Sequence, residues 1–169
     1  MLPAGIALGS NLGDRLGHLR IARDRLLDLH EGTAADFLVS PLFETEPVDC
    51  APGTAPFFNA VIELHSSLEP LDLLEAAQSI ERDLGRASRR PKNAPRTIDV
   101  DLLYLGDRVL ADDRLDLPHP RLLSRRFVLT PLAAIRPGLV LPGETRPIAT
   151  CLRELDSPEP EPTLARSAW

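Results

Sequence analysis

Residues 57–65 read Phe-Phe-Asn-Ala-Val-Ile-Glu-Leu-His. The residues at every second position are apolar and share one face: Phe58, Ala60, Ile62 and Leu64. This period of two predicts a strand that packs that face against a core. The other face carries Phe57 and Asn59, so the pattern places an aromatic ring beside an amide on the side away from this core.

Helical and extended segments flank this strand in a regular order. An apolar strand at 5–8, a helix with an apolar stripe over 12–29 and a strand at 37–40 precede it. A helix over 70–84 and a strand at 98–105 follow. The order strand, helix, strand, strand, helix, strand is the split βαβ arrangement, in which two helices cover one face of an antiparallel sheet. The fold class is therefore α+β and ferredoxin-like (βαββαβ), with C-terminal additions.

Local signals add four expectations. Asn11 follows a Gly-Ser turn and is expected to cap the first helix. Residues 44–56 are rich in proline and predict an irregular loop. A short helix is expected over 121–130, and the acidic, proline-containing residues 154–162 are expected to fray.

Composition narrows the class of protein. The chain has 169 residues, 43% of them hydrophobic, which suits one domain. The net charge of −6 offers no general attraction to nucleic acid or to an anionic membrane. Cys50 and Cys151 lie far apart and form no disulfide framework, and no apolar run approaches the ~18 residues of a membrane span. We expect a cytoplasmic protein without nucleic-acid or membrane partners.

Two carboxylates stand out in the strand at 98–105. Asp99 and Asp101 alternate with Ile98, Val100 and Leu102, so both acids fall on the face opposite the aliphatic residues. Paired carboxylates suit Mg²⁺, which is commonly held by one or two carboxylates together with substrate phosphates. A solvent-facing strand with scattered charges is the alternative reading of this motif alone.

Basic residues crowd the preceding segment. Residues 86–96 contain four arginines and one lysine and no acid. Arginine forks match phosphate oxygens, so cations beside a metal site favour phosphoryl-transfer chemistry. The chain contains neither a P-loop nor a dinucleotide-binding glycine motif, so a bound nucleotide must be held by side chains and metals.

Residues 95–103, Pro-Arg-Thr-Ile-Asp-Val-Asp-Leu-Leu, closely resemble the signature of the 6-hydroxymethyl-7,8-dihydropterin pyrophosphokinase family. Further blocks resemble the family in the same order along the chain: 6–12, 57–60, 78–81, 117–119 and 125–127. The resemblance implies an enzyme of folate biosynthesis. It would transfer pyrophosphate from ATP, its co-substrate, to the 6-hydroxymethyl group of 6-hydroxymethyl-7,8-dihydropterin and release AMP. It also implies a pyrophosphokinase domain over 1–152 and a tail over 153–169, with a monomer expected and a weak dimer as the alternative.

The same resemblance assigns residues. It implies that Asp99 and Asp101 bind two Mg²⁺ ions and that Arg86 and Arg96 act on the phosphates. It implies a pterin site made by Phe57, Phe127, Asn59, Thr45, Glu46, Pro47 and Val48. It implies a nucleotide site made by Gln78, Glu81, Arg96, Leu102, Arg114, His119 and Arg125.

Two other functions remain as alternatives. A ferredoxin-like module that binds RNA would use the basic segment and the Phe57 ring, although the net charge of −6 speaks against it. A two-metal phosphodiester hydrolase on Asp99 and Asp101 would need no acceptor alcohol. Formation of AMP that depends on the pterin separates all three.

Overall fold

The computed structural model describes residues 1–47, 53–85 and 96–169. Its main sheet has six strands, paired antiparallel throughout, in the order β5-β1-β4-β3-β8, and β2 also pairs with β4. The strands are β1 (Leu2–Ser10), β2 (Leu38–Val39), β3 (Leu42–Thr45), β4 (Phe57–Ser66), β5 (Asp99–Leu105) and β8 (Thr163–Arg166). A small second sheet pairs β6 (Leu110–Ala111) with β7 (Asp116–Leu117).

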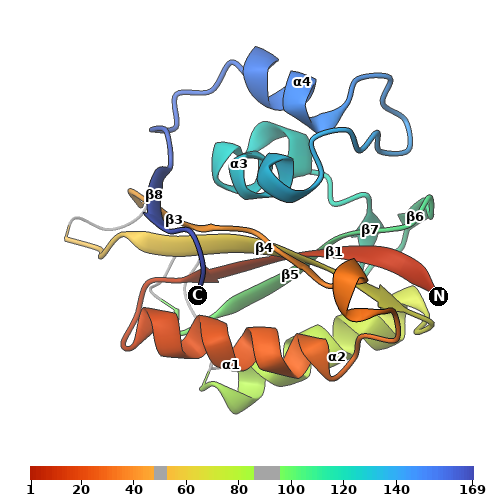
Figure 1. Ribbon diagram of the computed structural model, residues 1–169, viewed down its shortest axis with the longest axis horizontal. Helices are drawn as coiled ribbons and strands as arrows, with labels where there is room; N and C mark the ends of the chain where they lie inside the picture. The colour runs from red at the N-terminus through yellow and green to blue at the C-terminus, as the bar shows by residue number, and fades with distance from the viewer. Residues whose placement is uncertain (48–52, 86–95) are drawn as a thin grey trace.

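Helices lie on both sides of the sheet (Figure 1). One side carries α1 (Arg15–Leu27) and α2 (Pro70–Asp83), which confirms the predicted βαββαβ arrangement. The C-terminal additions α3 (Arg126–Ile135) and α4 (Ile148–Glu154) occupy the other side, with α3 next to the sheet. The helix expected over 121–130 thus begins at Arg126, after a 3₁₀ turn over Leu122–Ser124. Within the described ranges no helix is both long and apolar enough to cross a membrane.

The alternation of β4 is confirmed by burial. Ala60, Ile62 and Leu64 are buried in the core between the sheet and α1 and α2. Val61, from the other face, packs with α3 and α4 in a second core. The sheet therefore buries apolar area on both faces, and burial of this kind is the main favourable contribution to folding.

A β-bulge near the end of β5 changes the face of the sheet to which the following side chains point. Gly5 pairs with Tyr104 while Ile6 pairs with Leu102, so Leu103 is an extra residue in the ladder. Both Leu103 and Tyr104 consequently pack in the core on the α3 side. A side chain at position 5 would run into the Tyr104 ring, which explains the glycine there.

Tyr104 is part of a buried polar network. Its hydroxyl donates to Glu63 Oε2 over 2.6 Å, and Arg136 Nη1 donates to Glu63 Oε1 over 3.1 Å. Burial and the neighbouring Glu63 carboxylate raise the pKa of Tyr104 well above its ordinary value. The phenol therefore stays protonated and keeps donating.

The predicted cap of the first helix is wrong. α1 begins after Asp14, whose carboxylate accepts from the Gly17 backbone N–H over 3.0 Å. Asn11 lies three residues earlier and is buried, with its side chain committed to contacts far along the chain. Asparagine and aspartate both cap helices, and the chain uses the residue whose carboxylate reaches the first turn.

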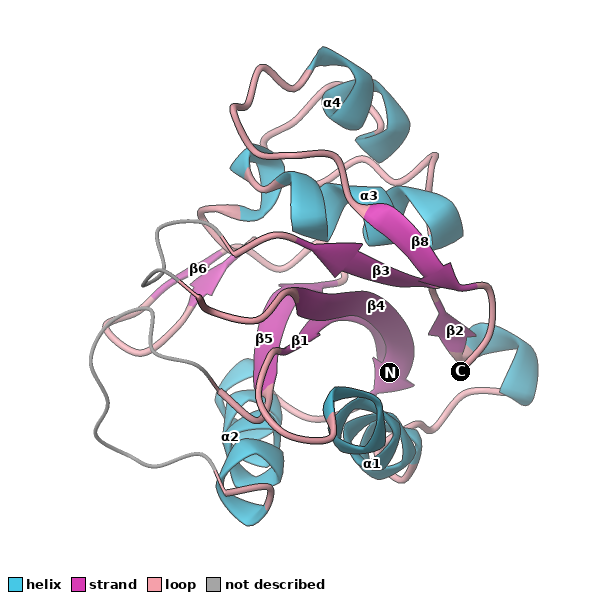
Figure 2. Ribbon diagram, turned by 90° about the vertical axis from the view of Figure 1, so that its left-hand side faces the viewer, coloured by secondary structure: helices cyan, strands magenta, loops and turns pink. Residues whose placement is uncertain are grey.

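The predicted fraying of residues 154–162 is also wrong, because the Leu155 carbonyl and the Glu159 carboxylate accept hydrogen bonds from Arg126 of α3. The residues that follow are held as well. β8 pairs with β3 at the edge of the sheet (Figure 2). Beyond it, Trp169 packs against the core, and its Nε1 donates to the Ser40 carbonyl over 2.9 Å. The Arg23 guanidinium lies 5.4 Å from the Trp169 ring centroid. In addition, β3 takes the first two residues of the loop expected over 44–56.

Candidate active site

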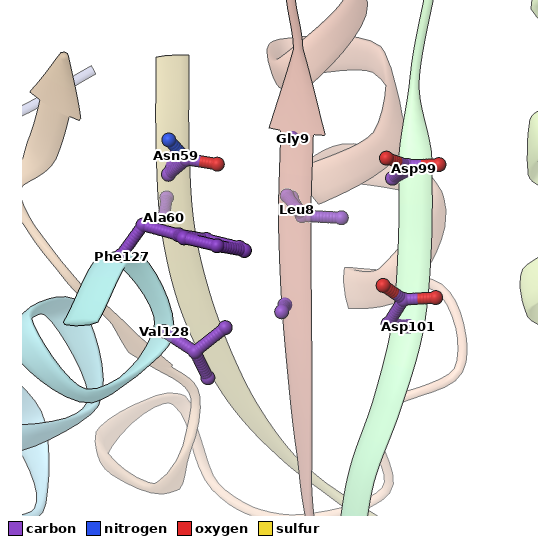
Figure 3. Close-up of a pocket in the computed structure, with 9 residues that line it drawn as sticks. Leu8, Gly9, Asn59, Ala60, Asp99, Asp101, Phe127 and Val128 are labelled. Carbon is purple, nitrogen blue, oxygen red and sulfur yellow. The ribbon is translucent and has the colours of Figure 1, made fainter. Parts of the chain in front are cut away.

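The two carboxylates of β5 face the α3 side of the sheet, as the alternation predicts (Figure 3). Opposite them on β1 stand two small residues: Asp99 pairs with Gly9, and Asp101 pairs with Ala7. No bulky side chain of β1 therefore stands beside the carboxylates on this face.

A row of three paired residues crosses the sheet at Gly9. Gly9 pairs with Asp99 on one side and with Asn59 of β4 on the other. A Cβ at position 9 would lie 3.2 Å from Asn59 Oδ1 and 3.9 Å from the Cβ of Asp99. Because glycine has no side chain, the space between the Asn59 amide and the Asp99 carboxylate stays open. The result is a small pocket of about 30 Å³, bounded above by Phe127 and Val128.

Two aromatic rings lie at this pocket: Phe127 lines it, and Phe57 lies next to Gly9, which also lines it. Phe127 is the second residue of α3, and its ring extends across β4 toward β1, on the side of Asn59 that faces the carboxylates (Figure 3). Phe57 begins β4, and its Cδ1 lies 3.9 Å from the Cβ position of Gly9. Phe57 and Asn59 therefore share a face, as the alternation of residues 57–65 predicts.

The Asn59 amide is oriented by a neighbouring strand. Its Nδ2 donates to the Thr45 hydroxyl of β3 over 2.6 Å, and both residues are buried. The carbonyl Oδ1 points toward Gly9 and would lie 3.2 Å from a Cβ at that position. Of the other predicted pterin residues, Glu46 is exposed and Pro47 half-buried just after β3, and Val48 lies outside the described residues.

Arg96 binds one of the carboxylates. Its Nη1 lies 3.0 Å from Asp99 Oδ1 and 2.8 Å from Asp99 Oδ2, and both side chains are mostly buried. The Arg96 guanidinium also lies 6.0 Å from the Phe57 ring centroid. The predicted phosphate ligand Arg86 lies outside the described residues.

Asn11 holds Arg96 in place, a role that sequence reasoning missed. Its Oδ1 accepts from the Arg96 backbone N–H over 2.9 Å, and its own N–H donates to the Arg96 carbonyl over 3.2 Å. Its Nδ2 reaches the Ala55 carbonyl over 3.4 Å. One buried amide thus ties the start of β5 to the segment before β4. The partners are 44 and 85 residues away, so no local signal reveals them.

A second, larger pocket of about 290 Å³ opens beside the first. Three of the predicted nucleotide residues line it: Leu102, Arg114 and His119. Asp101 lines both pockets, so a ligand in either one meets the same carboxylate.

The position of His119 is determined by its backbone. It follows the cis peptide bond between Leu117 and Pro118, and its N–H donates to the Leu103 carbonyl over 2.7 Å. Nδ1 accepts from the Arg121 N–H over 3.1 Å. Burial lowers the pKa of His119, and the nearby Asp101 carboxylate partly opposes this. The neutral ring therefore faces the larger pocket.

Arg125 lies within electrostatic reach of the carboxylates. Burial and the neighbouring Arg121 lower its pKa, and the charges of Asp101, Glu159 and Asp99 oppose the change. Its guanidinium lies 5.4 Å from the Phe127 ring centroid. Sequence reasoning placed it on the nucleotide side, and the structure puts it at the start of α3 beside the carboxylate pair.

Glu81 supports the strand that carries the acids. Its Oε1 accepts from the Val100 backbone N–H over 2.8 Å, between Asp99 and Asp101. β5 is an edge strand, so this carboxylate takes a donor that has no partner strand. Gln78 precedes Glu81 by three residues on α2, and neither residue lines the two pockets described above.

The carboxylate pair suits a hard cation. Its donors are oxygens only, and Asp99 and Asp101 lie on one face of one strand. Within residues 1–47, 53–85 and 96–169 no group of three or more His, Cys, Asp or Glu side chains converges as a metal site. A Mg²⁺ ion here would therefore take its other oxygens from phosphates and water, as Mg²⁺ commonly does.

Comparisons with known proteins agree on one family. The model of the 7,8-dihydro-6-hydroxymethylpterin-pyrophosphokinase (HPPK) family matches residues 5–137. A 2-amino-4-hydroxy-6-hydroxymethyldihydropteridine pyrophosphokinase from Bacillus subtilis is 44% identical over 133 residues, which are 78% of this chain and 77% of that protein. The enzyme of the same name from Pseudomonas aeruginosa is 41% identical over 138 residues, 81% and 82% of the two chains.

Solved structures agree on the fold. The structure of wild-type Plasmodium falciparum HPPK-DHPS superposes with a TM-score of 0.69 at 13% identity, over 90% of this chain and 44% of that one. This likeness concerns the fold alone, and it covers less than half of the larger protein.

Proposed function

Because the chain belongs to the 7,8-dihydro-6-hydroxymethylpterin-pyrophosphokinase family, we propose that the pterin ring binds at its smaller pocket, extending beyond the enclosed volume of about 30 Å³, and that the nucleotide binds in its larger pocket. Asp99 and Asp101 stand where the two meet. The single observation that carries this proposal is that Asp101 lines both pockets. A group transferred from one ligand to the other must pass this carboxylate.

The chain is a pyrophosphokinase of folate biosynthesis. The reaction joins the hydroxymethyl oxygen of the pterin alcohol to the β-phosphorus of ATP. The bond from that phosphorus to the oxygen bridging the α-phosphorus breaks, AMP leaves with that oxygen, and the hydroxyl proton is released. Such a displacement needs the two reactants in line, so positioning and electrostatic stabilisation carry most of the catalysis.

The smaller pocket offers the groups that a pterin needs. The Phe57 and Phe127 rings border it and provide flat apolar surfaces, and stacking on aromatic rings holds flat heterocycles. Asn59 supplies an amide for the polar edge of the ring, in an orientation held by Thr45. Thr45, Glu46, Pro47 and Val48 complete the proposed edge.

The carboxylate pair would hold the metal. We assign Asp99 and Asp101 to two Mg²⁺ ions, which when bound supply charge neutralisation to the triphosphate. Glu81 contributes by fixing the backbone of β5 between the two acids. Leu102, Arg114 and His119 would line the nucleotide, with Gln78 and Arg125 at its periphery.

Arg96 has two partners in this proposal. In the described structure it binds Asp99 through both carboxylate oxygens. If Asp99 held a metal ion, the Arg96 guanidinium would be available to bind the phosphates, the role also proposed for Arg86. The backbone bonds to Asn11 keep Arg96 at the site during this exchange.

The test is a single assay with two omissions. We expect AMP and the pterin diphosphate in equal amounts when ATP, Mg²⁺ and 6-hydroxymethyl-7,8-dihydropterin are all present. Omission of the pterin or of Mg²⁺ should abolish AMP. AMP release without the pterin would instead indicate the two-metal hydrolase, and RNA binding without turnover would indicate the binding module.

We further propose a cytoplasmic monomer, with a weak dimer as the alternative.

A further inference from the structure

The first turn of α3 is held by residues from the distant tail. Arg126, which begins α3, donates from its backbone N–H to Glu159 Oε2 over 2.8 Å. Its side chain donates from Nη2 to the Leu155 carbonyl over 3.1 Å. Its guanidinium is largely buried, and Nη1 lies 3.8 Å from Glu161 Oε1, at the surface. Backbone and side chain of one residue are thus bound to the tail.

The local sequence does not cap this helix. The first N–H groups of a helix have no partner within it and need an acceptor from elsewhere. The N-cap residue of α3 is Arg125, which makes no side-chain cap hydrogen bond, and the first turn contains no acid. Glu159 supplies both the acceptor and the negative charge that favour a helix N-terminus.

The same tail also pairs with β3, the strand whose Thr45 orients Asn59. A few residues after Glu159 it forms β8, in which Thr163 pairs with Glu44 and Leu164 with Phe43 of β3 (Figure 2). The Thr163 hydroxyl donates to the Glu44 carbonyl over 3.4 Å. Thr45, the next residue of β3, accepts from the Asn59 amide. Residues 155–166 therefore contact both the helix that carries Phe127 and the strand that orients Asn59.

We propose that Glu159 is a positioning residue for the pterin site, which fixes the first turn of α3 and thereby the place of the Phe127 ring at the smaller pocket. This inference rests on the proposed pterin site. It assigns to the tail a role in substrate affinity, which its composition does not suggest. The role acts through α3, because Glu159 is not among the residues that line either pocket.

Glu159→Ala and Glu161→Ala form a matched pair for the test. Glu159→Ala removes the carboxylate that accepts from the backbone of α3. Glu161→Ala removes a side chain that is 89% exposed and whose carboxylate contacts only the Arg126 guanidinium. We expect Glu159→Ala to weaken pterin binding about fivefold, the size of a lost helix cap, and to weaken binding of the MgATP analogue by a smaller factor, because the Glu159 charge also reaches Arg125. Glu161→Ala should change neither, since exposed ion pairs contribute little. Glu159→Gln keeps an acceptor oxygen and should restore most of the affinity.

Calorimetric titration with each ligand measures these affinities, and hydrogen exchange gives an independent readout. The amides of residues 126–129 should exchange faster in Glu159→Ala than in Glu161→Ala without any ligand. Should Glu159→Ala not fold, Ser157→Ala is used in its place, because the Ser157 hydroxyl accepts the Glu159 N–H over 3.2 Å. Ser157→Ala should also weaken pterin binding more than nucleotide binding, by a smaller factor than Glu159→Ala does.

Two outcomes overturn the inference. One is equal loss of pterin and nucleotide affinity in Glu159→Ala, and the other is unchanged pterin affinity. Phe127→Ala, titrated in parallel, separates this failure from that of the proposed function. If Phe127→Ala weakens pterin binding and Glu159→Ala does not, the role of Glu159 is refuted alone. If Phe127→Ala leaves pterin binding intact, the pterin site itself is misassigned.

Discussion

The Arg96 guanidinium binds both carboxylate oxygens of Asp99, with Nη1 at 3.0 Å from Oδ1 and 2.8 Å from Oδ2. The two residues are three positions apart at the start of β5, and the Asn11 amide holds the Arg96 backbone. A metal ion at Asp99 competes with this guanidinium. The ion pair therefore sets how tightly the empty site binds a cation.

Arg96→Ala should separate metal binding from turnover. Without nucleotide, we expect the variant to bind Mn²⁺ about threefold more tightly, because a partly exposed ion pair is worth up to about 1 kcal/mol. Turnover should fall, since the variant lacks the proposed phosphate ligand. Electron paramagnetic resonance of free Mn²⁺ measures the metal affinity, and AMP formation measures turnover. Arg108→Ala is the control, because its pair with Glu69 is exposed and 3.8 Å long. Unchanged Mn²⁺ affinity in Arg96→Ala would show that the two cations do not compete.

Asp99→Asn and Asp101→Asn should each lower turnover by at least about a hundredfold, because a catalytic metal stabilises the transition state by several kcal/mol. The melting temperature should change little, since both side chains border the pocket and the asparagine at position 99 keeps an oxygen that can accept from Arg96. Asp107→Asn, in the exposed turn after β5, provides the same chemical change outside the site. Near-normal turnover of either site variant at limiting Mg²⁺ would remove that residue from the metal site.

Phe57→Leu should weaken pterin binding about tenfold and leave the affinity for a MgATP analogue unchanged, because ring stacking is worth about 1–3 kcal/mol per base. Phe37→Leu is the matched control, since Phe37 packs against the core on the α1 and α2 side. Calorimetric titration of both ligands distinguishes the two variants. Equal losses for pterin and nucleotide would point to damage of the scaffold instead of loss of stacking.

Tyr104→Phe should lower the free energy of unfolding at neutral pH by about 1–3 kcal/mol, because the buried Glu63 carboxylate loses a donor. The pKa of Tyr104 is raised in the folded protein, so the stabilisation is complete below the ordinary tyrosine pKa of about 10 and is lost as the pH rises above it. Urea unfolding at pH 7 and pH 10.5 should therefore show a smaller difference between wild type and variant at the higher pH. A constant difference would contradict the assignment of Tyr104 as the titrating group.

Period-two alternation predicted much of this site. It placed Phe57 beside Asn59 on one strand and Asp99 beside Asp101 on another, and the structure confirms both shared faces. Alternation is a local property of the chain, so a single sequence reveals it. It fails at the bulge in β5, where one extra residue turns Tyr104 toward the α3 side. Pairing register depends on the partner strand and leaves no mark in the residues of β5 themselves.

The contacts that hold the site together were missed because they are distant in sequence. Asn11 resembles a helix cap until its partner, 85 residues away, is known. Acids and prolines near residue 159 resemble a frayed end until the uncapped turn of α3 is known. In both cases the local sequence is compatible with either structure, and contacts with distant residues determine which one forms.

Trp169 gives the protein an internal optical reporter. It is the only tryptophan of the chain, and its indole lies beside the Arg23 guanidinium with Nε1 bonded to the Ser40 carbonyl. Indole emission moves to longer wavelength when water replaces such surroundings, so one fluorophore reports whether the tail is docked on the sheet. The signal requires no label, and Trp169 lines neither pocket.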